Sequence, residues 1–147
     1  MSNSDPAALP RPDELLPHRA PFLFVDELLS VVPGESASGV WRLTGDEFFF
    51  AGHFPGRPTL PGVLMCEAIA QVGAAAVLAD PKFAGKLPLF GGLDRARFRR
   101  QVFPGEELVL EVELGRMSAR AGKGSGRALV GAEVACSCDL LFVLADA

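Results

Sequence analysis

The sequence is poor in the side chains that build disulfide frameworks and metal sites. Its 147 residues include three cysteines, two histidines, one tryptophan and no tyrosine. The odd cysteine count, in a chain whose start lacks the basic end and apolar run of a secretion signal, argues against a disulfide framework. A structural zinc site needs about four ligands, and both histidines sit in motifs apart from the cysteines. Cys66, Cys136 and Cys138 are therefore expected to be buried thiols, and no metal site is expected.

The sequence also lacks long uncharged apolar runs and an excess of positive charge. No apolar run reaches the ~20 residues that a membrane-spanning helix needs. The 14 basic and 18 acidic side chains leave a net charge of -4, which disfavours a nucleic-acid binder that depends on phosphate neutralisation. The hydrophobic content of 49% excludes a disordered or fibrous chain. We expect a globular cytoplasmic protein without a nucleic-acid or membrane partner.

The length is that of one domain. Residues 1–13 carry three prolines among small and polar side chains, which predicts a flexible N-terminal arm in front of a single domain at residues 14–147. The segments at 22–29 and 36–43 flank a turn at Pro33 and Gly34, which indicates a pair of strands.

A rigid loop and a long helix occupy the middle of the sequence. Glycine and proline recur so densely between Gly52 and Gly62 that regular structure is excluded there. Residues 63–78 are mostly strong helix formers that follow Pro61, so they predict one helix. Its apolar side chains cover every face, which is typical of a helix enclosed by other elements.

The remaining sequence predicts strands at 87–95, 96–103, 107–114 and 128–144. Apolar and acidic residues alternate through 107–114, as on a strand with one buried face. The glycine-rich and cationic segment 115–127 is interpreted as a solvated hairpin connection, because it has neither the spacing nor the following helix of a phosphate-binding loop. The predicted fold class is α+β, with five to seven antiparallel strands curved around one central helix.

Three groups near the predicted loop and helix are suited to acid–base chemistry. His53 lies in the rigid loop, and histidine is the usual proton carrier near neutral pH. Glu67 interrupts the apolar helix, where poor solvation raises a carboxyl pKa and favours a proton donor, and Gln71 is one turn away to orient it. The free amides of Gly62 and Val63 at the helix start can polarise a carbonyl. Together these groups suit proton abstraction beside a carbonyl with loss of a leaving group.

Structural roles compete with these assignments. A loop histidine is often structural, and a buried glutamate can simply be satisfied by Gln71 or by a backbone amide. Cys66 is a poor candidate nucleophile, since a helical cysteine among apolar neighbours lacks the cationic setting that makes a thiolate.

Three blocks of sequence resemble the 3-hydroxyacyl-[acyl-carrier-protein] dehydratases of type II fatty-acid synthesis. These blocks are LLPHRAPFLFVDELL, GHFPGRPTLPGVLMCEAIAQ and GGLDRARFRRQVFPGEELVLEVEL, and the resemblance extends from about Leu15 to Phe142. It implies a hot-dog fold built as a homodimer, often assembled into a hexamer that is a trimer of dimers. The implied lyase reaction is reversible dehydration of a (3R)-3-hydroxyacyl thioester to the trans-2-enoyl thioester, with no cofactor.

The resemblance also implies roles for individual residues. His53 and Glu67 correspond to the catalytic pair of the family, whose two members come from opposite subunits, and Gly62 corresponds to the amide that binds the thioester carbonyl. Phe54 is one of several phenylalanines available to line an acyl tunnel, with Phe48, Phe49, Phe50 and Phe90. The cluster of Arg95, Arg97, Arg99 and Arg100 suits docking of the acidic acyl carrier protein, or is a solvated strand face.

Two features bear on competing functions. Ala20 stands where the family often has an aromatic ring, so no gating ring is assigned here. Glutamate at position 67, where the dehydratase-isomerase branch has aspartate, disfavours isomerase activity. A hot-dog acyl thioesterase and a non-catalytic module that binds acyl carrier protein remain the alternatives. The intact GHFPG and PGV blocks count against the first, and retention of both His53 and Glu67 counts against the second.

Overall fold

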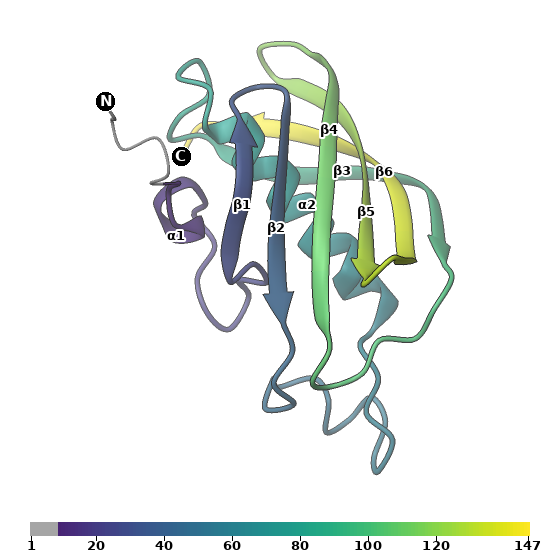
Figure 1. Ribbon diagram of the computed structural model, residues 1–147. Helices are drawn as coiled ribbons and strands as arrows, with labels where there is room; N and C mark the ends of the chain where they lie inside the picture. Colours follow the sequence, from purple (N-terminus) through teal and green to yellow (C-terminus); the bar gives the residue numbers. More distant parts are fainter. Residues whose placement is uncertain (1–8) are drawn as a thin grey trace, which may run out of the picture.

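A six-stranded antiparallel sheet curves around one long helix (Figure 1), in the computed structural model that describes residues 9–147. The spatial order of the strands is β1-β2-β4-β5-β6-β3. The elements are α1 (Pro12–Leu15), β1 (Glu27–Val32), β2 (Ser36–Arg42), α2 (Gly62–Leu78), β3 (Leu87–Phe98), β4 (Glu107–Met117), β5 (Ala121–Val130) and β6 (Glu133–Ala145). This arrangement confirms the predicted α+β hot-dog architecture.

The helix α2 forms the centre of the hydrophobic core. It begins at Gly62, one residue before the predicted start, and from Met65 to Leu78 every residue is buried except Glu67. The concave face of the sheet covers it with apolar side chains such as Leu108, Leu110 and Phe142. The three cysteines are buried free thiols, as expected, with Sγ of Cys66 3.9 Å from Sγ of Cys136.

The N-terminal part differs from the prediction at its edges. The strand pair β1–β2 is confirmed, but residues 22–26 are a loop. There the Phe24 amide donates its hydrogen bond to Oε1 of Gln71 rather than to a neighbouring strand. The expected flexible arm lies mostly outside the described residues. Within it, Pro12 and Asp13 begin the short helix α1, where proline suits the first position and Glu14 accepts a hydrogen bond from the Arg11 amide.

The glycine-rich segment 115–127 is not the solvated connection that its composition predicts. Only Ser118–Arg120 turn, and from Ala121 onward the chain is strand β5. A Cβ atom on Gly126 would lie 2.4 Å from Cγ2 of Ile69 in α2. The glycine therefore lets the sheet approach the helix closely, which a local sequence pattern does not reveal.

Two other strand assignments change. The predicted strands 87–95 and 96–103 are replaced by the single edge strand β3, which ends at Phe98, and residues 99–103 are a loop. The strand is irregular between Phe90 and Gly92 and between Asp94 and Arg97. The predicted strand 128–144 is split into β5 and β6 at Gly131, whose φ of +59° suits glycine.

Among residues 9–147, no helix combines the length and apolar character that a membrane crossing requires.

Candidate active site

The loop between β2 and α2 holds His53 in one orientation. Nδ1 of His53 lies 2.9 Å from the carbonyl oxygen of Thr59, and the Thr59 amide donates back to the His53 carbonyl across 2.9 Å. An imidazole nitrogen that faces a carbonyl must carry the proton, so Nε2 is left with the free lone pair. The rigid loop predicted from glycine and proline therefore directs Nδ1 of His53 to a carbonyl and leaves Nε2 as the nitrogen that can accept a proton.

The start of α2 lies in an open groove of about 800 Å³ with Phe54, Gly62, Val63 and Arg99 among its lining residues. The amides of Gly62 and Val63 precede the first intrahelical hydrogen bonds and have no acceptor within residues 9–147. The ring of Phe98 packs against Gly62, where a Cβ atom would lie only 2.8 Å from it. The helix start can thus receive a carbonyl oxygen at a position that a larger residue would close.

Glu67 lies one turn further along α2, in a small cavity that it shares with Gln71, Phe90 and Phe142. Nε2 of Gln71 donates to Oε2 of Glu67 across 2.9 Å, which is the predicted contact. Burial raises the pKa of the Glu67 carboxyl, and the hydrogen bond from Gln71 opposes that rise. The predicted upward direction is confirmed, and it suits a group that must hold a proton before donating it.

Sequence reasoning missed one side chain at this cavity. Nε2 of His18, from the loop before β1, lies 3.8 Å from Oε2 of Glu67. The two residues are 49 positions apart, so no helical or strand periodicity links them. The available signal was the PHRAP segment within the blocks that carry the family resemblance.

The structure does not join all of the predicted residues within one chain. His53, Phe54, Gly62 and Val63 belong to the loop and the helix start, whereas Glu67 and Gln71 open into the other cavity. No hydrogen bond or ion pair within the described part of the chain connects His53 with Glu67. One chain therefore presents two candidate half-sites, one with His53 and the free amides of Gly62 and Val63 and one with Glu67.

The five candidate tunnel phenylalanines separate into two groups. Phe50 is buried, and Phe49 packs against Phe24 and Trp41 in the core. Phe48 and Phe54 are 62% and 53% exposed, and Phe90 lines the cavity beside Glu67. The residues that remain available for a substrate are thus Phe48, Phe54 and Phe90.

The four clustered arginines differ in their ion pairs. Arg95 pairs with Asp139 at 2.8 Å. Arg100 binds Glu106 at 2.7 Å and Glu133 at 3.2 Å, and the Glu106 hydrogen bond raises the Arg100 pKa above its ordinary value. Arg97 and Arg99 are exposed and make no ion pair with residues 9–147. These two carry the free positive charge of the cluster.

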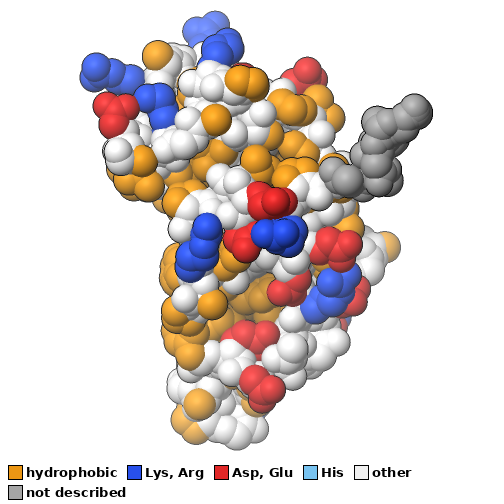
Figure 2. All heavy atoms as spheres, turned by 90° about the vertical axis from the view of Figure 1, so that its left-hand side faces the viewer, with side chains coloured by type: hydrophobic (Ala, Val, Ile, Leu, Met, Phe, Trp, Pro, Cys, Tyr) orange, Lys and Arg blue, Asp and Glu red, His pale blue; other side chains and the backbone are white. Residues whose placement is uncertain are grey.

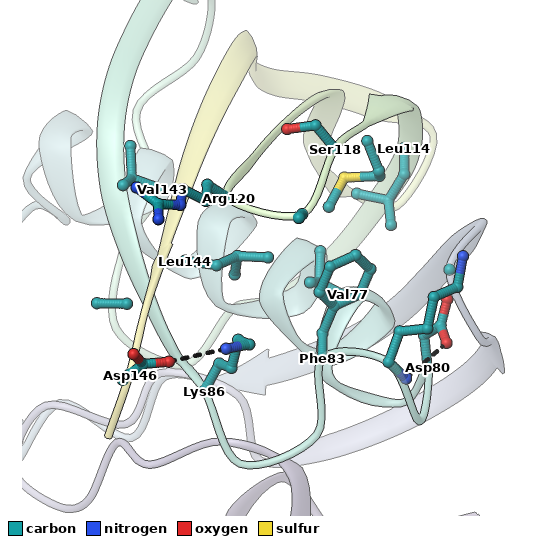
Figure 3. A pocket seen from close by; sticks show the side chains of 15 residues that line it. Val77, Asp80, Phe83, Lys86, Leu114, Ser118, Arg120, Val143, Leu144 and Asp146 are labelled. Atoms are coloured by element: carbon teal, nitrogen blue, oxygen red, sulfur yellow. Dashed lines mark hydrogen bonds and ion pairs between the residues drawn. The ribbon is translucent and has the colours of Figure 1, made fainter.

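A larger cavity, of about 1050 Å³, lies at the other end of α2, where Val77, Phe83 and Leu144 meet the Lys86–Asp146 ion pair of 2.9 Å (Figure 3). It is lined by none of the predicted site residues. Elsewhere, the side of the molecule near β1 shows hydrophobic patches between interspersed acidic and basic groups (Figure 2). The cavity of about 1050 Å³ contains neither a histidine nor Glu67.

Known proteins support the same interpretation. Residues 16–139 match the model of the family described as FabA-like domain. A protein of Moorella thermoacetica named 3-hydroxyacyl-[acyl-carrier-protein] dehydratase FabZ is 54% identical over 132 residues, which cover 90% of this chain and 92% of the relative. A protein of the same name from Pelotomaculum thermopropionicum is 53% identical over 131 residues, covering 89% of this chain and 94% of the relative.

Two solved structures share the fold. The dehydratase heterocomplex ApeI:P from Xenorhabdus doucetiae has a TM-score of 0.82 at 18% identity, over 95% of this chain and 93% of that one. The conserved protein PA5202 from Pseudomonas aeruginosa has a TM-score of 0.69 at 12% identity, over 92% of this chain and 99% of that one.

The sheet-wrapped helix and its two half-sites thus define a hot-dog protein of the FabA-like class. Within that class, the chain belongs to the family of 3-hydroxyacyl-[acyl-carrier-protein] dehydratases, as its sequence blocks predict.

Proposed function

We propose that this protein dehydrates (3R)-3-hydroxyacyl-[acyl-carrier-protein] reversibly to the trans-2-enoyl thioester, as a lyase of fatty-acid biosynthesis. The observation that carries the proposal is that one group is placed to accept a proton and another is placed to hold and donate one. The Nδ1 hydrogen bond to Thr59 leaves Nε2 of His53 free to accept a proton, and burial favours the protonated form of Glu67. Dehydration needs one group in each of these states at the same time.

The proposed mechanism moves two protons. Nε2 of His53 removes the C2 proton of the acyl thioester, while the Gly62 amide, with Val63 beside it, stabilises the negative charge on the thioester oxygen. The electron pair left at C2 forms the double bond as the C3–O bond breaks. Glu67 protonates the departing hydroxyl, which leaves as water. Both groups return to their starting states by proton exchange, so the reaction needs neither a metal nor a redox cofactor.

A homodimer is the proposed functional unit, with His53 of one subunit facing Glu67 of the partner subunit. The separation of the two half-sites within one chain supports this arrangement. The edge strand β3 supports it as well, because Leu89, Leu93 and Phe98 are 50%, 42% and 52% exposed along an unpaired sheet edge. A trimer of such dimers is the larger assembly to test by light scattering.

The acyl carrier protein is the proposed partner, and Arg97 and Arg99 are its proposed docking residues. Their free charges complement an acidic carrier, and Arg99 lines the groove that contains Gly62. Arg100 lines the same groove, although its charge, like that of Arg95, is already paired. The expected cytoplasmic location follows from this partner and is tested by cell fractionation.

Ultraviolet absorbance of a trans-2-enoyl or 3-hydroxyacyl carrier thioester tests the proposed reaction. Wild-type protein should change the enoyl absorbance, and His53→Ala and Glu67→Gln should each lower the rate by about 10²-fold or more while they remain folded. A thiol-reactive dye run in parallel detects thioester hydrolysis. Flat absorbance with carrier binding, or release of free thiol, would overturn the dehydratase assignment in favour of a binding module or a thioesterase.

A further inference from the structure

His18 is enclosed with the proposed acid Glu67 in one small cavity. The side chains of His18 and Glu67 are 20% and 18% exposed, and Nε2 of His18 lies 3.8 Å from Oε2 of Glu67. The cavity is otherwise lined by Gln71 and by uncharged residues, among them Pro88 and Phe142. Among residues 9–147, Glu67 is therefore the one charged group that faces the imidazole across this cavity.

The surroundings of Nδ1, the other ring nitrogen of His18, indicate which nitrogen of the ring carries the proton. Nδ1 is buried and has no hydrogen-bond partner within residues 9–147. A buried N–H without an acceptor is rarer in proteins than a buried acceptor without a donor, so Nδ1 holds the lone pair and Nε2 holds the proton. The N–H of His18 therefore faces Oε2 of Glu67.

The loop that carries His18 is tied to the same helix. Nη1 of Arg19 donates to the carbonyl oxygens of Leu16 and His18, across 2.8 and 2.7 Å, which fixes the turn. Gln71 donates from Nε2 to the Phe22 carbonyl at 3.1 Å and accepts the Phe24 amide at Oε1 at 2.8 Å. Gln71 thus holds both the loop and the Glu67 carboxyl, so the imidazole and the acid keep a defined relative position.

Two N–H groups are consequently directed at the same carboxyl oxygen, because Gln71 donates to Oε2 at 2.9 Å and His18 faces Oε2 at 3.8 Å. We propose that His18 is a positioning residue for Glu67, which together with Gln71 reserves Oε2 as an acceptor and leaves the transferable proton on Oε1. This inference rests on the proposed function of Glu67 as the acid. We expect substrate binding to shorten the 3.8 Å separation to a hydrogen bond, because catalytic contacts are often long in the free enzyme.

His18 acts in its neutral form. Burial lowers the pKa of His18, and the neighbouring charge of Arg19 lowers it further. A neutral imidazole does not force Glu67 to ionise before catalysis, as an imidazolium would. Once Glu67 has given its proton to the leaving hydroxyl, the N–H of His18 stabilises the carboxylate that forms.

Two substitutions of matched size separate this role from simple packing. Glutamine places an amide N–H near the position of Nε2, whereas methionine has the same unbranched length and no N–H donor. His18→Met should lower kcat by about tenfold or more, and His18→Gln should stay within about threefold of wild type, since hydrogen bonds to charged groups carry effects of that size. KM should change little in either variant.

Carbon-13 NMR titration of the Glu67 carboxyl, assigned with Glu67→Gln, supplies a readout that is independent of turnover. The Glu67 pKa should move upward in His18→Met, because the carboxylate loses a donor, and should stay near the wild-type value in His18→Gln. Equal kcat and equal Glu67 titration in the two variants would overturn the role of His18. Inactive wild-type protein would instead overturn the proposed function, while the titration would still report on the contact.

Discussion

Gln71 donates a hydrogen bond to Glu67 across 2.9 Å, one helical turn away, while the rest of its amide group binds the loop before β1. Because Phe24 is 2% exposed, its amide has no water to replace the Gln71 acceptor. We expect Gln71→Met to lower the free energy of unfolding by about 1–3 kcal/mol, the range for a buried donor left unsatisfied.

Urea denaturation measures this effect, and the chain offers a matched control. Gln101 is exposed, so Gln101→Met should change the free energy of unfolding by no more than about 0.5 kcal/mol. A similar stability for the two variants would show that Gln71 does not anchor the loop. Because Gln71 also orients Glu67, kcat should fall in Gln71→Met as well.

Mixed dimers test whether each active site combines two subunits. A heterodimer of His53→Ala and Glu67→Gln chains holds one site with both residues intact if the sites cross the interface, and none if each site lies within one chain. Random pairing makes half of the dimers mixed, so co-refolding the two inactive variants should restore about a quarter of wild-type activity. Activity that stays at the level of the separate variants would place each site within a single subunit.

Charge reversal tests the proposed docking residues. The double variant Arg97→Glu, Arg99→Glu should raise KM for the acyl-carrier-protein substrate by about tenfold at low ionic strength, because like charges would then face the acidic carrier. KM for an acyl-pantetheine substrate should not change, and the difference should shrink as salt is added. Arg116→Glu, an exposed cation at the end of β4, is the control. An equal loss with both substrates would point to damage of the site itself.

The parts of the site that the sequence predicts are those whose geometry is local. The contact between Glu67 and Gln71 follows from a spacing of four residues on a helix, and the fixed loop around His53 follows from its glycines and prolines. The raised pKa of Glu67 follows from the apolar residues around it in the helix. Each of these needs only residues that are near one another in the chain.

The missed features depend on contacts between distant segments. His18 meets Glu67 only because Gln71 holds the loop before β1 against α2. Gly126 belongs to a strand, although its neighbours have the composition of a turn, because the close approach of Ile69 decides what fits there. Local preference and tertiary packing disagree at this position, and packing determines the structure.

Stability should depend on pH through Glu67. Burial raises the pKa of its carboxyl in the folded protein above the value in the unfolded chain. Stability is therefore complete below the ordinary glutamate pKa and is lost as the pH rises through the folded value. Glu67→Gln removes this dependence, so its free energy of unfolding relative to wild type should increase as the pH rises above the ordinary glutamate pKa. The exposed Glu113→Gln is the control, and a constant difference for Glu67→Gln in urea titrations would contradict the raised pKa.

The close approach of β5 to α2 predicts a large effect from one methyl group. A Cβ atom on Gly126 would lie 2.4 Å from Cγ2 of Ile69 and 2.9 Å from the Glu111 carbonyl oxygen, so Gly126→Ala should lower the free energy of unfolding by about 1–3 kcal/mol. Gly115 in β4 is the matched control, since its Cβ would meet only the Lys123 carbonyl oxygen, at 3.6 Å. Gly115→Ala should be neutral or slightly stabilising. Equal thermal stability of the two variants would show that β5 can move away from the helix without cost.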